Sequence, residues 1–144
     1  MLVIGKILKK VNDYNNFLNE LNITERQIQL LVNMDNVVET TSDLYHKSNS
    51  KIHGTGVFAS KNIRKGEIIG DVSKDSKYRT TLGRWVNHSK DHNTKFRYKK
   101  DNVNMFAVAD KDINVNEEIL VNYRHHVNNT NILRVIQTIE CFNN

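Results

Sequence analysis

The chain has 144 residues, with 21 Lys and Arg against 16 Asp and Glu, so its formal net charge is +5. This length favours one domain whose hydrophobic core needs no covalent cross-links. Its one cysteine, Cys141, excludes an internal disulfide framework and a zinc site built on several thiolates. No apolar run is long enough for a membrane span, and the N-terminus lacks the pattern of a secretory signal. We therefore expect an intracellular protein with no membrane association.

The first helical pattern covers residues 6–21. A second helix is predicted to begin at Thr24, because Thr24 and Gln27 fit a capping box and Ile23 and Ile28 fit the accompanying hydrophobic staple. The two helices would form a helical hairpin joined at Asn22-Ile23. The apolar stripes that support these helices are Ile7, Leu8, Val11, Tyr14, Phe17, Leu18 and Leu21 in the first, and Ile28, Leu31 and Val32 in the second.

From about residue 50 to residue 124, glycines separate short segments rich in Ile, Val, Phe and Tyr, which is typical of strands. Turns are expected at Lys65-Gly66-Glu67 and at Val115-Asn116-Glu117. Without alternating strands and long helices, a parallel Rossmann sheet is not expected. The strand candidates are Val57-Phe58-Ala59, Ile68-Ile69, Met105–Ala109 and Ile119-Leu120-Val121.

A final helix is expected near residues 131–142, with Ile132, Val135, Ile136 and Ile139 on one stripe. It could be a packing helix, a flap over a ligand or a dimer contact.

Positive charge is concentrated in residues 74–100. Residues 1–50 carry 5 basic and 6 acidic side chains, whereas residues 51–144 carry 16 basic and 10 acidic ones. Such a block could attract nucleic acid or an acidic partner, and a solvated basic face is the alternative. The nine basic residues of the block are Lys74, Lys77, Arg79, Arg84, Lys90, Lys95, Arg97, Lys99 and Lys100.

Two short motifs could carry chemistry. Gly54-Thr55-Gly56 lacks the third glycine of a dinucleotide fingerprint, so it is either an ordinary turn or a place where the backbone approaches a ligand. Asn87-His88-Ser89 matches a glycosylation sequon, but we expect no secretory route. Neighbouring residues of an extended chain point to opposite faces, which argues against a catalytic triad. The histidine spacings of the chain fit no familiar zinc site.

Together, these motifs resemble the SET-domain protein lysine methyltransferases. The resemblance covers Ile52 to Arg124, about half of the chain. Four segments match the family in order and at its spacing. They are Gly54–Ala59, Ile63–Ile69, Arg84–Ser89 with Asn93, and Ala109–Ile113 followed by Glu117–Tyr123.

The resemblance implies an α+β, mainly β, SET fold, with small antiparallel sheets around a pseudoknot. In that fold the segment of Asn87-His88-Ser89 packs against the segment that ends in Tyr123. The expected organisation is an N-terminal helical extension (1–49), a SET domain (50–124) and a C-terminal helical segment (125–144).

The resemblance also implies methyl transfer from S-adenosyl-L-methionine to lysine side chains of a protein. By position, the cofactor would contact Thr55, Gly56, Arg84, Trp85, Asn87, His88 and Tyr123, with Asn87 acting through its side chain and His88 largely through its backbone. Tyr123 would be the catalytic tyrosine of the channel. Val121 would line the substrate channel, where a small side chain leaves room for di- or trimethylation.

The attacking lysine must be neutral. Deprotonating a lysine with an ordinary pKa at pH 7 costs about 4.6 kcal/mol. A sulfonium at about 4 Å would oppose the ammonium by about 4 kcal/mol at an effective dielectric near 20, and desolvation acts in the same direction. Alignment is then needed more than a dedicated base.

The chain departs from the family in several places. Lys90 stands where a cysteine is usual, and no cysteine cluster follows Tyr123, so we expect no metal and no zinc-binding post-SET segment. The C-terminal helix is the expected cover of the cofactor. This compact layout resembles viral or bacterial SET proteins, which would place a viral protein in the host cytoplasm or nucleus.

The substrate candidates are a histone, a ribosomal protein or a nucleoid protein, close to nucleic acid, and a homodimer is a further expectation. The alternative functions are a catalytically silent SET-like binding module and a small basic nucleic-acid-binding protein.

Overall fold

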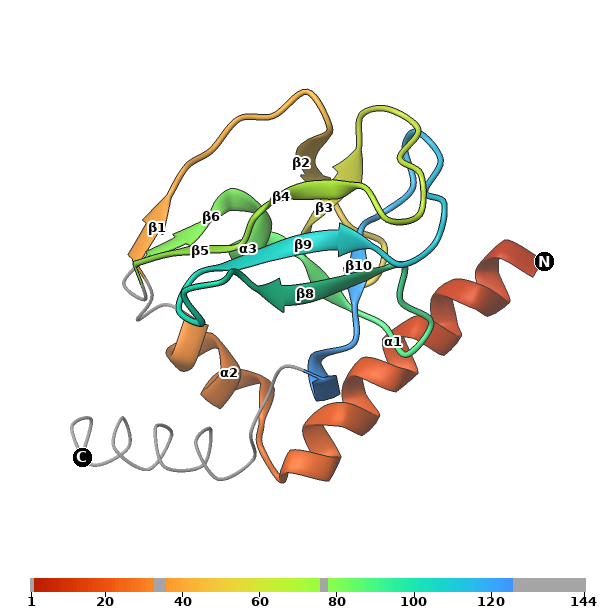
Figure 1. Ribbon diagram of the computed structural model, residues 1–144. Coiled ribbons are helices and arrows are strands. Elements are labelled where there is room, and N and C mark those ends of the chain that lie inside the picture. The colour runs from red at the N-terminus through yellow and green to blue at the C-terminus, as the bar shows by residue number, and fades with distance from the viewer. Residues whose placement is uncertain (1, 33–35, 76–77, 126–144) are drawn as a thin grey trace.

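The computed structural model describes residues 2–32, 36–75 and 78–125, and it describes side chains outside 2–11 and 30–32 (Figure 1). Two helices come first, followed by short strands, a short third helix and a closing 3₁₀ turn at Tyr123–His125. The helices are α1 (Leu2–Leu21), α2 (Glu25–Val32) and α3 (Thr81–Trp85). The strands are β1 (Asn36–Val38), β2 (Tyr45–Asn49), β3 (Thr55–Ala59), β4 (Ile68–Asp71), β5 (Ser73–Lys74), β6 (Tyr78–Thr80), β7 (Asn87–His88), β8 (Thr94–Tyr98), β9 (Met105–Ala109) and β10 (Leu120–Val121).

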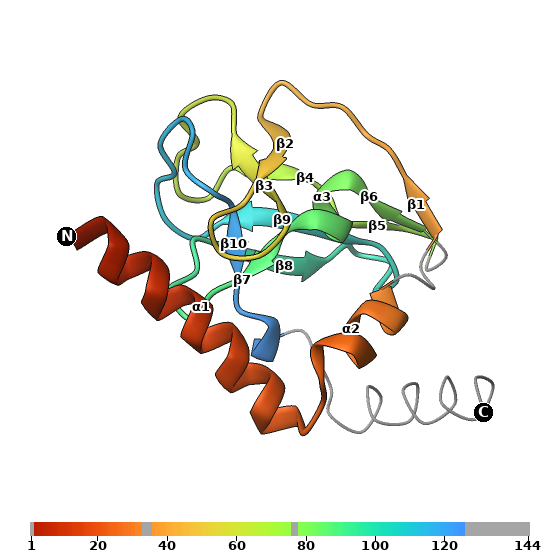
Figure 2. The same ribbon diagram turned by 180° about the vertical axis from the view of Figure 1, so that it is seen from behind.

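The predicted capping box between the first two helices is confirmed. The Thr24 amide donates to Gln27 Oε1 at 2.9 Å, and the Gln27 amide donates to the Thr24 hydroxyl at 3.2 Å. Ile23 is buried and Ile28 packs against the same cluster, as the hydrophobic staple requires. Asn22 makes the turn with φ of +55°. Figures 1 and 2 show that the helices diverge from this turn, so the predicted hairpin is an open V.

The described strands form four small sheets, and every predicted strand segment is present, except that Ile119 lies just before β10. β2 pairs with β3, and β9 lies between β4 and β8, with all of these pairings antiparallel. A third sheet has the order β1-β6-β5, in which β1 and β6 are parallel. The two predicted turns contain left-handed residues, Gly66 with φ of +92° and Asn116 with φ of +71°.

The fourth sheet joins β7 to β10 in parallel, which brings together two segments distant in the sequence. The Ser89 amide donates to the Val121 carbonyl at 2.9 Å. Asn93 pins the same two segments, because its Nδ2 donates to the Glu118 carbonyl and its Oδ1 accepts from the Leu120 amide, both at 2.9 Å. The expected packing of the Asn87 segment against the Tyr123 segment is therefore confirmed.

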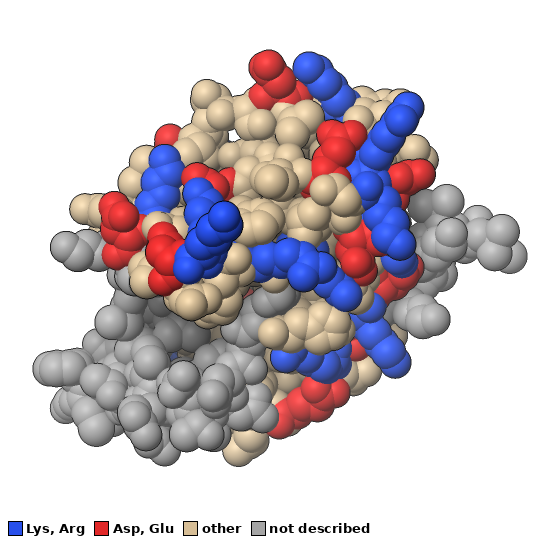
Figure 3. Space-filling model, in the orientation of Figure 1, with Lys and Arg blue, Asp and Glu red and all other residues tan. Residues whose placement is uncertain are grey.

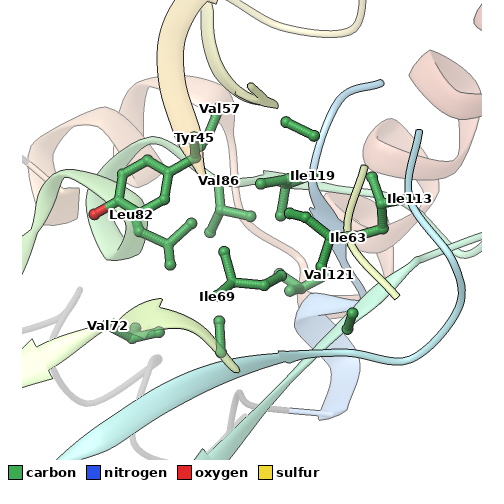
Figure 4. Close-up of a cluster of buried hydrophobic side chains, with 13 residues drawn as sticks. Tyr45, Val57, Ile63, Ile69, Val72, Leu82, Val86, Ile113, Ile119 and Val121 are labelled. Atoms are coloured by element: carbon green, nitrogen blue, oxygen red, sulfur yellow. The ribbon is translucent and has the colours of Figure 1, made fainter. Parts of the chain in front are cut away.

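One main core lies between the sheets and α3 (Figure 4). Its residues come from strands early and late in the sequence of the β body (β1 to β10), for example Tyr45 of β2 and Val121 of β10. β1 and β2 pair with β6 and β3, so the β body begins before residue 50. The core consists of Tyr45, Val57, Ala59, Ile63, Ile69, Val72, Leu82, Val86, Ala107, Ala109, Ile113, Ile119 and Val121.

A second cluster belongs to the helices and contains Tyr14, Phe17, Leu18, Leu21 and Ile23. Tyr123 packs against both clusters and so joins the helices to the β body. None of the described helices is both long and apolar enough to cross a membrane. The helix expected at 131–142 lies outside the described residues.

Candidate active site

A cavity of about 490 Å³ lies between the N-terminal helices and the β body. Its wall combines two helices, the Gly54-Thr55 loop, the α3–β7 segment and two strands of the central sheet. The lining residues are Tyr14, Phe17, Ile28, Gln29, His53, Gly54, Thr55, Val72, Ser73, Arg79, Gly83, Arg84, Trp85, Val86, Asn87, Phe96, Met105 and Tyr123.

Asn87 stands at the start of β7 because α3 ends just before it. The Thr80 hydroxyl caps α3 by accepting from the Gly83 amide at 3.1 Å. The side-chain amide of Asn87 then donates to the carbonyl of His53 at 2.9 Å and to that of Thr55 at 3.2 Å. Asn87 therefore holds the Gly54-Thr55 loop against β7 from both sides of the loop.

Glu118 brings the closing motif to the same place. Its Oε2 accepts from Asn87 Nδ2 at 2.9 Å, and its Oε1 accepts from the Ser50 hydroxyl at 2.8 Å. The Glu118 carboxylate lies so close to Gly56 that a Cβ added there would be 2.5 Å from Oε2. Glycine at position 56 thus leaves room for the carboxylate that links the three motifs.

Tyr123 is part of the cavity wall. Its hydroxyl donates to the Val86 carbonyl at 2.7 Å, and its ring meets Phe17 edge-on at 5.7 Å between centroids. Burial raises the pKa of Tyr123 far above its ordinary value, although the positive charges of Arg79 and Arg84 act in the opposite direction. The phenol is therefore protonated at neutral pH, and its oxygen keeps the capacity to accept a hydrogen bond.

Trp85 forms an aromatic wall covered by positive charge. The Arg84 guanidinium lies 4.1 Å from the centre of its ring, and the Lys47 ammonium lies 5.2 Å from it. Both distances are within the range of a cation–π interaction. Within the described part of the chain, the indole Nε1 of Trp85 is the one buried side-chain nitrogen or oxygen without a hydrogen-bond partner.

His88 points away from the cavity, toward α1. Its Nδ1 accepts from the Tyr123 amide at 2.9 Å, so the ring proton is on Nε2, which contacts Asp13 Oδ2 at 2.9 Å. Phe17 stacks on the imidazole at 5.0 Å between centroids. Burial lowers the pKa of His88 below its ordinary value, and the attraction of Asp13 opposes this only in part. The imidazole is therefore neutral at pH 7.

Arg124 completes the attachment of α1. It binds Asp13 Oδ1 through Nη2 at 3.1 Å and Glu20 Oε2 through Nε at 2.8 Å. Burial raises the pKa of Asp13, but the hydrogen bond and the charge of Arg124 outweigh it, and the net shift is downward. A polar groove of about 620 Å³ beside these residues is lined by neither Asn87 nor Tyr123.

Five of the seven residues that the sequence assigns to the cofactor line the cavity, namely Thr55, Arg84, Trp85, Asn87 and Tyr123. The other two lie elsewhere. Gly56 is buried beside Glu118, and His88 faces α1. Val121, expected in the substrate channel, is fully buried in the main core and is not part of the cavity wall.

Sequence reasoning missed the helical side of this wall. Tyr14, Phe17 and Ile28 were expected only to pack, and His53 and Gln29 were not singled out, but all five line the cavity. The helical stripe indicates which residues are buried, but it contains no signal for the surface that they face.

No group of three or more His, Cys, Asp or Glu side chains that could hold a metal exists within residues 2–32, 36–75 and 78–125. The basic block of residues 74–100 is not a uniform patch either. Lys99 pairs with Asp71 at 2.9 Å and Lys95 with Asp110 at 3.7 Å. Figure 3 shows acidic side chains among the basic ones on this face.

Small sheets joined by a parallel crossing, with the three motifs meeting at one cavity, define a SET-type architecture. Residues 71–124 match the family model described as the SET domain. The match includes the Arg84–Ser89 and Glu117–Tyr123 motifs and agrees with the resemblance that the sequence indicates. No curated protein has significant similarity to the chain.

Solved structures similar to the chain include one from Chaetomium thermophilum and one from Plasmodium falciparum. A humanized mutant of the Chaetomium thermophilum Polycomb Repressive Complex 2, bound to the inhibitor GSK126, has 21% identity and a TM-score of 0.48. That match covers 61% of this chain but only 16% of the Chaetomium chain. A Plasmodium falciparum protein assigned as a histone methyltransferase has 23% identity and a TM-score of 0.45, with 58% and 95% of the two chains covered.

Proposed function

We propose that the protein transfers a methyl group from S-adenosyl-L-methionine to the side chain of a lysine in a protein substrate. The single observation that carries this proposal is the cavity itself. In a chain whose residues 71–124 match the SET domain, Asn87, the Gly54-Thr55 loop and Tyr123 line one cavity.

The cavity fits a nucleoside cofactor. Its volume of about 490 Å³ lies within the range of about 300–1,000 Å³ that is typical of small-molecule sites. Aromatic and aliphatic side chains make up half of the lining residues, and the polar ones are Gln29, His53, Thr55, Ser73, Arg79, Arg84 and Asn87. Trp85, whose buried indole nitrogen has no hydrogen-bond partner among the described residues, belongs to this wall. Trp85, Arg84, Asn87 and Thr55 would hold the cofactor.

Bound S-adenosyl-L-methionine supplies the methyl group and a positive charge. The task of the protein is to present a neutral, aligned lysine amine. Burial raises the pKa of the Tyr123 hydroxyl, and the charges of Arg79 and Arg84, which line the cavity, oppose that rise, while those of Glu118 and Glu25 add to it. The two guanidinium groups would disfavour an ammonium beside them, and removal from water has the same effect.

Tyr123 fixes the geometry of the reaction. Because the hydroxyl donates its proton to the Val86 carbonyl, the oxygen is held in one orientation with its lone pairs turned away from that carbonyl. A neutral amine that enters the cavity can donate to this oxygen, which would direct the nitrogen lone pair toward the methyl group. Such alignment can lower the barrier by about 7–11 kcal/mol at most.

The experiment that tests the proposal is a transfer assay with labelled S-adenosyl-L-methionine and extracts of candidate hosts. Mass spectrometry of the labelled band identifies the protein, the lysine and the number of methyl groups. This readout also distinguishes histone, ribosomal and nucleoid substrates, which are our candidates.

Tyr123→Phe should reduce labelling at least about 100-fold, because a positioning hydroxyl is lost while the ring and its packing remain. Tyr98→Phe is the matched control, because Tyr98 is 61% exposed on β8 and does not line the cavity. Full labelling by a folded Tyr123→Phe protein would contradict the assigned role of Tyr123. Absence of any labelled protein with wild type, despite cofactor binding, would favour the silent binding module.

A further inference from the structure

The N-terminal helices contribute a wall of the cavity through α2 as well as α1. Ile28 and Gln29 of α2 and Tyr14 and Phe17 of α1 line the same space as Thr55 and Asn87. These four side chains come from outside the residues 71–124 that match the SET domain. The cavity wall therefore includes α1 and α2, which contain none of the SET motifs.

One carboxylate joins these helices to the motif loop. Glu25, the first residue of α2, accepts from the Tyr14 hydroxyl at 2.7 Å, from Gln29 Nε2 at 2.9 Å and from His53 Nε2 at 2.7 Å. Tyr14 belongs to α1 and Gln29 to α2, while His53 directly precedes Gly54. Glu25 thus contacts all three sides of this end of the cavity at once.

The network continues to the centre of the site. The carbonyl of His53 accepts from Asn87 Nδ2 at 2.9 Å, so α2 is connected to β7 through Glu25 and His53. Burial raises the pKa of Glu25, but the hydrogen bonds of Tyr14 and Gln29 and the interaction with His53 outweigh it, and the net pKa is lowered. Glu25 is therefore ionised at neutral pH and accepts all three bonds as a charged group, which strengthens them.

We infer that α1 and α2 form the cover of the cofactor site, with Ile28 and Gln29 in contact with the cofactor and Glu25 as the positioning residue that holds the cover closed. This inference rests on the proposed function, because it concerns the same cavity and the same cofactor. It gives the N-terminal helices the covering role that the sequence led us to expect of the C-terminal helix.

The chemistry of this cover suits a nucleoside. Tyr14, Phe17 and Ile28 offer two aromatic rings and a branched aliphatic chain to the cavity that Trp85 also lines, and Gln29 offers an amide that can both donate and accept. Apolar walls with few polar groups are typical of sites that enclose such ligands. Opening the V of α1 and α2 would remove this side of the wall and expose the ligand to water.

The test measures binding of S-adenosyl-L-homocysteine, the demethylated product, to the full chain by isothermal titration calorimetry. Trp85 is the only tryptophan of the chain and lies in the wall, so its fluorescence gives a second readout. Glu25→Gln should weaken binding about fivefold to tenfold, since tenfold corresponds to the 1.4 kcal/mol expected for one charge-assisted bond. In transfer assays the same variant should raise the KM for the cofactor and change kcat less than about twofold.

Two further variants keep the test decisive. Gln29→Ala should also weaken binding, because it removes a side chain of the wall without removing the carboxylate. Arg26→Gln is the matched control: Arg26 is exposed on α2 and is not part of the wall, so its binding should equal that of wild type. Circular dichroism and thermal melting show that each variant is folded.

The outcomes separate this inference from the proposed function. Wild-type binding that is unchanged in both Glu25→Gln and Gln29→Ala would overturn the inference alone. Lack of binding by wild type would overturn the proposed function and the inference with it. Weakened binding in both variants, with Arg26→Gln unchanged, would support both.

Discussion

Asn87 and His88 are neighbours on one two-residue strand, but their side chains serve opposite sides of the molecule. Asn87 faces the cavity and joins the Gly54-Thr55 loop to Glu118. His88 faces α1 and joins Asp13 to the Tyr123 amide. The alternation of an extended chain thus separates a binding side from an assembly side. Substitutions on the Asn87 side should mainly weaken ligand binding, and substitutions on the His88 side should mainly weaken the attachment of α1.

The largest effect is expected for Asn87→Ala. This change leaves two carbonyls and one carboxylate without their shared donor inside the protein, and it frees the Gly54-Thr55 loop. Unsatisfied buried acceptors cost about 1–3 kcal/mol each, so we expect a loss of roughly 2–4 kcal/mol in the free energy of unfolding. Binding of S-adenosyl-L-homocysteine should fall below detection, and urea titration and calorimetry measure the two effects.

Asn114→Ala is the control for that change, because Asn114 is an exposed turn residue. Asn114→Ala should alter neither the free energy of unfolding nor the binding of S-adenosyl-L-homocysteine. Wild-type affinity in Asn87→Ala would show that the side chain of Asn87 does not hold the binding loop.

Gly56→Ala should have a smaller effect on the same side. The new methyl group would lie 2.5 Å from Glu118 Oε2 and 3.1 Å from Ser50 Cβ, so the carboxylate must move and its bond to Asn87 must lengthen. We expect a loss of about 1–3 kcal/mol in unfolding free energy and weaker cofactor binding. Gly54→Ala distinguishes a steric clash from backbone strain. A methyl group at Gly54 would meet no neighbouring atom, but the φ of +47° is one that alanine rarely adopts. Equal stability of Gly56→Ala and wild type would contradict the described position of Glu118.

The His88 side should have a distinct pH dependence. Burial lowers the pKa of His88 below about 6.5, and protonation of Nδ1 would break its bond with the Tyr123 amide. The unfolded chain therefore binds this proton more readily than the folded one. The associated stability is present above pH 6.5 and is lost as the pH falls through 6.5 toward the lower folded pKa. Asp13 also has a lowered pKa, but its contribution is lost only below about pH 3.8.

Urea titrations of wild type and His88→Asn between pH 7.5 and 5 measure this effect. The variant keeps an acceptor near the Tyr123 amide but does not titrate, so its stability should depend less on pH than that of wild type. His46→Asn, which changes an exposed histidine outside this contact, should keep the wild-type slope. The same slope in His88→Asn and wild type would contradict the assignment of a neutral, buried imidazole.

Local features of the fold could be predicted from the sequence because their signals are local. The capping box of Thr24 and Gln27 and the strand Met105–Ala109 depend on residues a few positions apart. The β7–β10 pairing was predicted only from the family resemblance, because no periodicity relates segments so far apart. The docking of α1 through Asp13 and His88 could not be predicted, since one pair of residues 75 positions apart leaves no pattern in the chain.

The same limit applies to the site. Thr55, Arg84, Trp85, Asn87 and Tyr123 belong to recognisable motifs, and the structure brings them to one cavity. The side chains of the helical wall have no motif, and a buried stripe looks the same whether it faces a core or a ligand.

The most direct test of the account is hydrogen–deuterium exchange of the full chain with and without S-adenosyl-L-homocysteine. The account predicts slower exchange on binding in residues 53–56 and 84–88 and also in residues 14–29, where the helical wall lies. The distant turn at residues 63–67 serves as the internal reference and should not change. Protection of 53–56 and 84–88 without any change in 14–29 would contradict the helical wall, and no protection anywhere would contradict the cavity as a cofactor site.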